Sequence, residues 1–118
     1  MKKKNIIKNE KDFTKIINSC PYKKNDYYVI YYQETKDINR YGITVPKKTG
    51  KANIRNKIKR RIKNIIDLNE KNIHKPYDYV IIIRKRIIEL NYREMEQQLI
   101  PLIEKIGERD GLQEKKEI

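Results

Sequence analysis

The residues of this sequence that could do chemistry are cations, gathered in one segment that contains no acid. Between Asp37 and Asp67 there is no Asp or Glu, although the chain has 16 in total. The same segment holds ten of the 29 Lys and Arg residues: Arg40, Lys47, Lys48, Lys51, Arg55, Lys57, Lys59, Arg60, Arg61 and Lys63. Surface helices normally mix both signs, because opposite charges four residues apart stabilise one another. The segment is therefore predicted to meet an external polyanion, and a net charge of +13 favours nucleic acid before an anionic membrane.

Residues that could build a catalytic or metal site within this chain are sparse. His74 is the only histidine, and Cys20 is the only cysteine and precedes Pro21. The sequence has no glycine-rich phosphate loop and no paired-histidine motif, and its acids are scattered through expected turns. We therefore expect no catalytic residue and no metal site on the protein. A single cysteine fits a reducing cytoplasm, and no apolar run approaches the ~20 residues of a membrane-spanning helix.

The elements that must position the cations are predicted to form one domain. A length of 118 residues fits a single RNA-binding domain, with a core over about 7–106 and mobile tails at 1–6 and 108–118. Periodicity and end signals predict helices over residues 9–18, 52–68 and 91–106, and strands over 27–32, 40–45 and 79–83. The predicted order is α-β-β-α-β-α, which belongs to the α/β class as an α+β sandwich around a central sheet.

The helix predicted over residues 52–68 has two faces of different character. With about 100° per residue, one stripe contains Ile54, Ile58, Ile62, Ile65 and Ile66. The opposite side gathers Asn53, Asn56, Lys57, Arg60 and Asn64, and a basic row along one flank contains Arg55, Lys59 and Lys63. The stripe is predicted to pack on the sheet, which leaves the polar side for an anion. A membrane-surface helix would need a similar pattern, but this stripe is narrow and is better explained by packing.

The segment over residues 42–60 resembles the signature of the bacterial ribonuclease P protein subunit. It reads GITVPKKTGKANIRNKIKR, and the family shows a strand, Ser-Lys-Lys, Gly-x-Ala and then Arg-Asn-Arg-x-Lys-Arg on a long helix. Pro46 stands in the place of the usual Ser, and Lys57 in the place of the second Arg. The resemblance extends over about 7–103. The pair Asp12-Phe13 resembles the first helix of the family, residues 77–84 its third main strand and residues 90–92 the start of its last helix.

This resemblance implies a fold and an activity. The fold would be an α/β sandwich with a left-handed crossover. The protein would be a subunit of a ribonucleoprotein endoribonuclease that removes the 5′ leader from precursor tRNA. Its partners would be precursor tRNA and the catalytic RNA, which would supply the active site, and Mg²⁺ would be the cofactor, bound mainly by RNA. The complex would act in the cytoplasm, without a membrane partner or a small-molecule substrate.

The resemblance also assigns two sets of binding residues. The catalytic RNA would be bound by Lys47, Lys48, Gly50, Lys51, Asn53, Arg55, Asn56, Lys57 and Arg60. The single-stranded leader would lie in a cleft between the first helix and the sheet, because aromatic rings and cations suit unpaired strands. The lining candidates are Phe13, Ile17, Tyr28, Tyr31, Lys59 and Lys63. The spacing of Phe13 on its helix is equally consistent with a plain core residue. Tyr28 and Tyr31 point to opposite faces of one strand, and Tyr31 is the better candidate.

A second class of function stays open at this point. A small ribosomal or other structural RNA-binding protein would share the charge and the order of elements, but it would need no cleft for a leader. The observation that separates the two is whether the chain raises cleavage of precursor tRNA when it is added to the catalytic RNA at low Mg²⁺.

Overall fold

The computed structural model describes residues 3–36, 38–73 and 76–106. Four strands form one sheet in the order β1-β2-β4-β3: β1 (Tyr22–Lys24), β2 (Tyr28–Glu34), β3 (Arg40–Thr44) and β4 (Tyr77–Ile83). The α-helices are α1 (Glu10–Ser19), α2 (Ala52–Leu68) and α3 (Tyr92–Ile106). Short 3-10 helices are η1 (Lys3–Asn5), η2 (Lys47–Thr49), η3 (Glu70–Asn72) and η4 (Lys85–Glu89). The predicted mixed α/β class is confirmed, and the predicted order omits one strand, β1.

Strand β1 has no strand signal of its own. It is three residues long and two of them are lysines, so neither alternation nor β-propensity marks it. It forms because β2 offers an antiparallel partner, with Tyr22 opposite Tyr31 and Lys24 opposite Val29. Pairing with a neighbour, a tertiary effect, therefore creates this strand.

The other strands follow the predicted pattern. Strand β2 runs antiparallel to β1 and to β4, whereas β3 runs parallel to β4. The parallel pair requires a crossover, and α2 supplies it; the hand of that crossover stays a prediction. Strand β4 lies between β2 and β3, and its continuous apolar sequence over residues 79–83 is typical of a strand covered on both faces.

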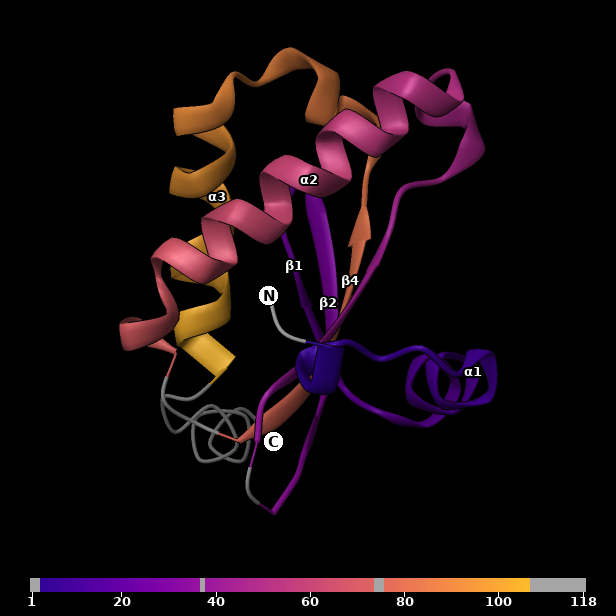
Figure 1. Ribbon diagram of the computed structural model, residues 1–118, viewed down its shortest axis with the longest axis vertical. Helices are drawn as coiled ribbons and strands as arrows, with labels where there is room; N and C mark the ends of the chain where they lie inside the picture. The colour runs from indigo at the N-terminus through magenta and orange to yellow at the C-terminus, as the bar shows by residue number, and fades with distance from the viewer. Residues whose placement is uncertain (1–2, 37, 74–75, 107–118) are drawn as a thin grey trace, which may run out of the picture.

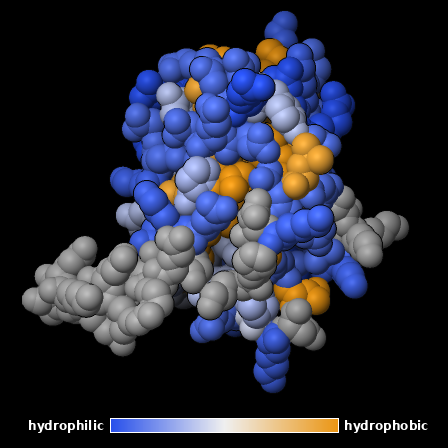
Figure 2. Space-filling view, turned by 90° about the vertical axis from the view of Figure 1, so that its left-hand side faces the viewer, coloured by the Kyte–Doolittle hydropathy of each residue, from blue (hydrophilic) through white to orange (hydrophobic). Residues whose placement is uncertain are grey.

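The two faces of the sheet are covered differently (Figure 1). Helices α2 and α3 cover one face, which we call the closed face. Its strand residues belong to the main core: Tyr28, Ile30, Tyr32, Tyr41, Ile43, Tyr79, Ile81 and Ile83. Helix α1 lies on the other face, which we call the open face, and forms a smaller cluster there around Ile7, Ile16 and Val80. Figure 2, which views the molecule from the left-hand side of Figure 1, shows mostly hydrophilic side chains on the outer surface.

The ends of the helices follow from short-range hydrogen bonds that the sequence predicts. The side chain of Asn9 accepts from the backbone N–H of Lys11 at 2.8 Å, so Asn9 caps α1. At the start of α3, the Asn91 side chain accepts from the Glu94 N–H at 2.8 Å, and Glu94 Oε1 accepts from the Asn91 N–H at 2.9 Å. This reciprocal pair is a capping box, which the spacing of Asn91 and Glu94 in the sequence favours. Helix α3 continues through Pro101.

The N-terminal segment is held against the edge of the sheet, which corrects part of the predicted mobile tail. Residues 3–5 form η1, and Ile6 forms an isolated parallel bridge with Tyr41. The Ile7 N–H donates to the Tyr41 carbonyl at 2.9 Å, and Asn5 Nδ2 donates to the Asn39 carbonyl at 2.7 Å. Edge strand β3 thus orders the segment. The tails predicted at residues 1–2 and 108–118 lie outside the described residues.

The isoleucine stripe of α2 packs on the sheet with one exception. Ile58, Ile62, Ile65 and Ile66 are buried, whereas Ile54 is 42% exposed, so its predicted burial is wrong. The first turn of α2 faces the Gly50 connector instead of the sheet: a Cβ placed on Gly50 would lie 3.3 Å from Ile54 Cγ2.

Candidate nucleic-acid interface

The residues predicted to bind the catalytic RNA form one surface over η2 and the first half of α2, which we call the docking surface. It contains Lys47, Lys48, Gly50, Lys51, Asn53, Arg55, Asn56, Lys57 and Arg60. All are exposed except Gly50 and Arg55, which are half-buried. Within the described residues, no acidic side chain forms an ion pair with any cation of this surface. The structure therefore brings the predicted set together, and its role stays a prediction.

Backbone groups add to the positive character of the docking surface. The first turn of α2 contains no acid, and its N-cap residue, Lys51, makes no side-chain capping hydrogen bond. The first N–H groups of a helix carry a partial positive charge and attract anions. Arg55 Nε donates to the Gly50 carbonyl at 3.1 Å, which ties the connector to the helix. Both features favour a phosphate backbone as the ligand.

A groove of about 470 Å³ lies between α1, β3 and α2. Phe13 and Thr14 of α1 line one side, and Lys59 and Lys63 of α2 line the other. Strand β3 forms the floor with residues 41–44. Three of the residues predicted to bind the leader, Phe13, Lys59 and Lys63, therefore share one groove, although they come from two helices far apart in the sequence.

Phe13 lies directly on strand β3 at a glycine. A Cβ atom added to Gly42 would lie 2.4 Å from Phe13 Cζ and 2.7 Å from Cε2, closer than real side chains approach one another. The absence of a side chain at Gly42 therefore lets the ring rest on the strand. The ring is half-buried, so it is neither a core residue nor a fully exposed one.

The open face has its other aromatic residues in register across the strands. One row joins Gly42, Val80, Tyr31 and Tyr22, and the next row joins Thr44, Ile82, Val29 and Lys24. Exposure rises along the first row, from buried Gly42 and Val80 to half-buried Tyr31 and exposed Tyr22. Ile17 of α1 packs at half-burial in the same cluster as Tyr31. Apolar surface is thus left accessible beside α1.

Tyr28 does not belong to this site, which corrects one predicted residue. It lies on the closed face, is 0% exposed, and donates its hydroxyl proton to the Met95 carbonyl at 3.0 Å. Burial raises the pKa of Tyr28. Successive residues of a strand alternate between faces, so Tyr31 reaches the open face and Tyr28 faces α3.

Three residues near the predicted site were missed by reasoning from the sequence. Tyr22 was missed because β1 has no strand signal. Arg84 and Lys85 follow β4 and line a hollow of about 260 Å³ together with Lys48 of the docking surface and Ile82 of the open face. The sequence shows these two residues as a run of cations at the end of a strand. Only the packing of η4 beside η2 shows that they lie next to the docking surface. The hollow joins the two surfaces.

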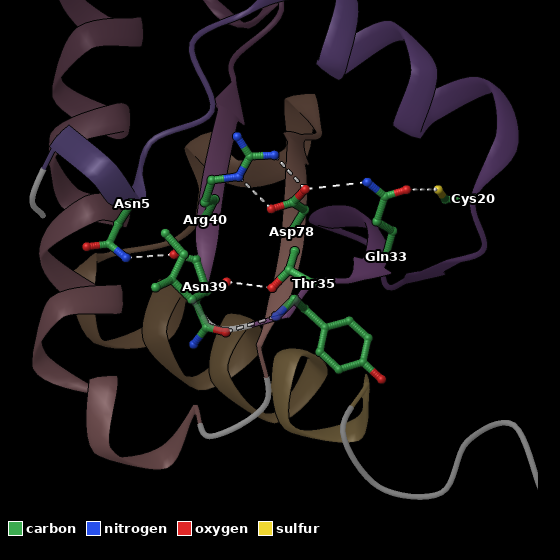
Figure 3. A network of polar contacts seen from close by, with 9 residues as sticks. Asn5, Cys20, Gln33, Thr35, Asn39, Arg40 and Asp78 are labelled. Atoms are coloured by element: carbon green, nitrogen blue, oxygen red, sulfur yellow. Dashed lines mark hydrogen bonds and ion pairs between the residues drawn. The ribbon is translucent and has the colours of Figure 1, made fainter.

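An ion pair between buried Asp78 and half-buried Arg40 fixes the strands beneath α1 (Figure 3). Asp78 is 1% exposed and accepts from Arg40 Nε at 2.8 Å and from Arg40 Nη2 at 2.7 Å. The hydrogen bond to Asp78 raises the pKa of Arg40. Gln33 Nε2 donates to Asp78 at 3.4 Å, and the Cys20 thiol donates to Gln33 Oε1 at 3.4 Å. The chain of contacts links β3, β4 and β2 to the end of α1 and so holds the open face in place.

The described residues contain no group of three or more His, Cys, Asp or Glu side chains that could hold a metal ion. Among them, no helix is long and apolar enough to cross a membrane.

Comparisons with known proteins agree with the predicted resemblance. The sequence model of the family described as Ribonuclease P matches residues 1–107. The ribonuclease P protein component of Streptococcus agalactiae (strain NEM316) is 41% identical over 108 residues, 91% of this chain and 98% of that protein. The component of Mycoplasma capricolum is 42% identical over 108 residues, 90% and 99% of the two chains.

The solved structures give the same result for the fold. The RNase P protein of Staphylococcus aureus is similar with a TM-score of 0.80 at 29% identity, over 88% of this chain and 95% of that one. The RNase P protein of Thermotoga maritima is similar with a TM-score of 0.78 at 31% identity, over 84% and 94%. Sequence and fold therefore point to one family.

Proposed function

Since this chain belongs to the ribonuclease P protein family, we propose that it binds the catalytic RNA of ribonuclease P and the 5′ leader of precursor tRNA. As the protein subunit of this ribonucleoprotein, it has a role in tRNA processing. In the proposal, the docking surface holds the catalytic RNA, and the groove with the open face holds the unpaired leader. The RNA carries the active site that cleaves the leader from the tRNA. The proposed compartment is the bacterial cytoplasm, which the bacterial origin of the relatives supports.

The observation that carries the proposal is that α2 borders both surfaces. Asn56 and Arg60 belong to the docking surface, while Lys59 and Lys63 face the groove that contains Phe13. A rigid helix that contacts two ligands holds them in a fixed relation. Positioning of this kind accelerates a reaction without any catalytic group on the protein. The leader would thus enter the RNA active site from a defined direction.

In the proposal, these residues bind RNA by electrostatic attraction to phosphates and by apolar contact with bases. Cations without acidic partners displace counterions from phosphates, which gives an affinity that falls steeply with salt. Phe13, Ile17 and Tyr31 offer apolar and aromatic surface to unpaired bases. Mg²⁺, bound mainly by the RNA, would activate the attacking water and stabilise the negative charge that develops at the cleaved phosphate. The described residues of this chain do not fit a metal site, so no step of the proposal uses a metal held by the protein.

The test uses the full chain with ribonuclease P RNA. We expect the protein to raise cleavage of precursor tRNA at low Mg²⁺. Arg55→Ala, Asn56→Ala and Arg60→Ala should weaken assembly in a filter-binding titration. Each of the two arginine variants should also reduce the salt slope by about one unit, because a cation is lost, whereas Asn56→Ala removes a neutral side chain and should leave the slope unchanged. Asn56 and Arg60 are exposed and lie off the buried stripe, so their replacement should change the free energy of unfolding by no more than about 0.5 kcal/mol. Arg55→Ala also removes the hydrogen bond to the Gly50 carbonyl and should cost about 1 kcal/mol.

Lys105→Ala is the matched control, because it removes an exposed cation from α3, away from the docking surface. It should leave RNA affinity and the salt slope at the wild-type values. If Arg60→Ala behaves like Lys105→Ala, the docking surface is wrongly assigned. If the protein binds RNA but never raises precursor-tRNA cleavage, the alternative of a purely structural RNA-binding protein holds.

A further inference from the structure

Tyr22 extends the aromatic surface of the open face to the edge of the sheet. It lies on β1 opposite Tyr31 of β2, and the two ring centroids are 5.2 Å apart with an interplanar angle of 46°. Tyr22 is 50% exposed, whereas Tyr31 is half-buried. The inner surface of the Tyr22 ring is thus supported by a second ring, and its outer surface is accessible.

The position of Tyr22 continues the proposed leader surface. In the row Gly42, Val80, Tyr31 and Tyr22, Phe13 rests on the first member and Tyr22 is the last. Three strand spacings separate the ends, a distance of about 14 Å. That length exceeds the width of one base, so different bases of one strand would contact Phe13 and Tyr22.

The charges next to Tyr22 suit a phosphate backbone. Lys24 is exposed and shares the open face with Tyr22, because it lies two residues farther along the same strand. Within the described residues it forms no ion pair with an acid. An aromatic ring beside a cation without an acidic partner is the combination that binds single-stranded nucleic acid with little sequence preference.

We propose that Tyr22 is a stacking platform for an unpaired leader base, distinct from the base that contacts Tyr31. This inference rests on the proposed function and deepens it: the leader surface has a further position on β1. Because the two rings contact each other, one base cannot stack on both. Each tyrosine therefore contributes to affinity only when the leader reaches a certain minimal length, and the two minimal lengths differ by at least one nucleotide.

The experiment measures the affinity of the assembled ribonucleoprotein for precursor tRNA, with leaders lengthened one nucleotide at a time from none. The proteins are wild type, Tyr31→Ala, Tyr22→Phe and Tyr22→Leu. Phenylalanine keeps the ring, and leucine keeps apolar contact with Tyr31 but removes the aromatic surface. Tyr92→Ala is the control, since Tyr92 is a half-buried tyrosine on α3 that packs against the core of the closed face. We expect Tyr22→Leu to lose about tenfold in affinity once the leader is long enough, and Tyr22→Phe and Tyr92→Ala to match wild type.

A second measurement separates stacking from a purely structural role. A 2-aminopurine placed at successive leader positions loses fluorescence when it stacks. We expect one position to be quenched with wild type and Tyr22→Phe, and unquenched with Tyr22→Leu. Thermal melts of the two variants should match, which excludes a loss of β1.

The outcomes separate the inference from the proposed function. If wild-type affinity does not depend on leader length, the proposed function fails and the inference fails with it. If Tyr31→Ala reduces leader binding while Tyr22→Leu follows wild type at every length, the proposed function stands and the inference is overturned. An equal loss with Tyr22→Leu on mature tRNA, which has no leader, would also overturn it.

Discussion

The closed face and the open face of the sheet are built from the same strands but have different surroundings. On the closed face, Tyr28, Ile30 and Ile81 are 0% exposed beneath α2 and α3. On the open face, α1 covers Val80 but leaves Val29, Tyr31 and Ile82 half-buried. Strand alternation supplies apolar side chains to both faces. The difference shows that helix coverage decides which apolar face becomes core and which stays available to a ligand.

The prediction with the largest expected effect tests whether α2 packs on the closed face of the sheet. Ile58→Asp should abolish the cooperative thermal melt, because an unpaired carboxylate at a buried position costs several kcal/mol, a large part of the stability of a small domain. Ile54→Asp is the matched control, with the same change one turn earlier at a position that is 42% exposed. It should melt close to wild type. A normal melt for Ile58→Asp would mean that this face of α2 is not packed on the sheet.

The second prediction uses the tyrosines of the closed face. Burial raises the pKa of Tyr28 and Tyr79, and raises that of Tyr41 to about 12. Above pH ~10 the unfolded chain releases these protons while the folded chain retains them, so the unfolded state binds fewer protons and the free energy of unfolding falls as the pH rises. The stabilisation is complete below pH ~10, and the fall is about 1.4 kcal/mol per pH unit for each tyrosine.

The measurement is chemical denaturation at a series of pH values between about 10 and 12. Tyr28→Phe removes one of the three groups and should flatten the slope by one third. The slope is compared, not the stability at neutral pH, because Tyr28→Phe also removes the hydrogen bond to the Met95 carbonyl. An unchanged slope would mean that the pKa of Tyr28 is the same in the folded and the unfolded state.

The smallest expected effect is on the open face, where packing is looser. Gly42→Ala would place a methyl group 2.4 Å from Phe13 Cζ, so the ring must move. Overpacking a site costs about 1–3 kcal/mol, and we expect the lower end because Phe13 is half-exposed and can turn outward. Denaturation of Gly42→Ala in a Phe13→Leu background is the control, and the smaller side chain should remove most of the cost. An equal cost in both backgrounds would show that the ring does not rest on Gly42.

Much of the fold could be predicted from local patterns. Helix α2 runs over Ala52–Leu68, the range that its isoleucine period predicts. The capping box at Asn91 and Glu94 forms as the sequence indicates. The alternation of residues along β3 separates Tyr41 and Ile43, which lie in the main core, from Gly42, which lies beneath Phe13. These features depend on residues close together in the chain. Over such short distances, the geometry of a helix or a strand sets the direction of each side chain from the residue spacing.

The candidate site could be predicted only in part. The docking surface is continuous in sequence over one connector and one helix, so its residues were foreseeable as a group. The residues of the proposed leader surface were harder to predict: Tyr28 is buried on the closed face and does not belong to it, and Tyr22 is proposed as a further member. Both corrections concern which strand pairs with which and which helix covers each face.

The sequence by itself determined the charge of the α2 surface, the positions of the long elements and the family. Each of these depends on residue types and short-range spacing, which are present before the chain folds. Only the tertiary structure decided that β1 exists, that residues 3–7 lie along β3, and that α1 leaves Tyr31 and Tyr22 accessible. These features arise from pairing and packing between segments distant in the sequence. A three-residue strand such as Tyr22–Lys24 gains its hydrogen bonds, and its candidate site, only when β2 is already beside it.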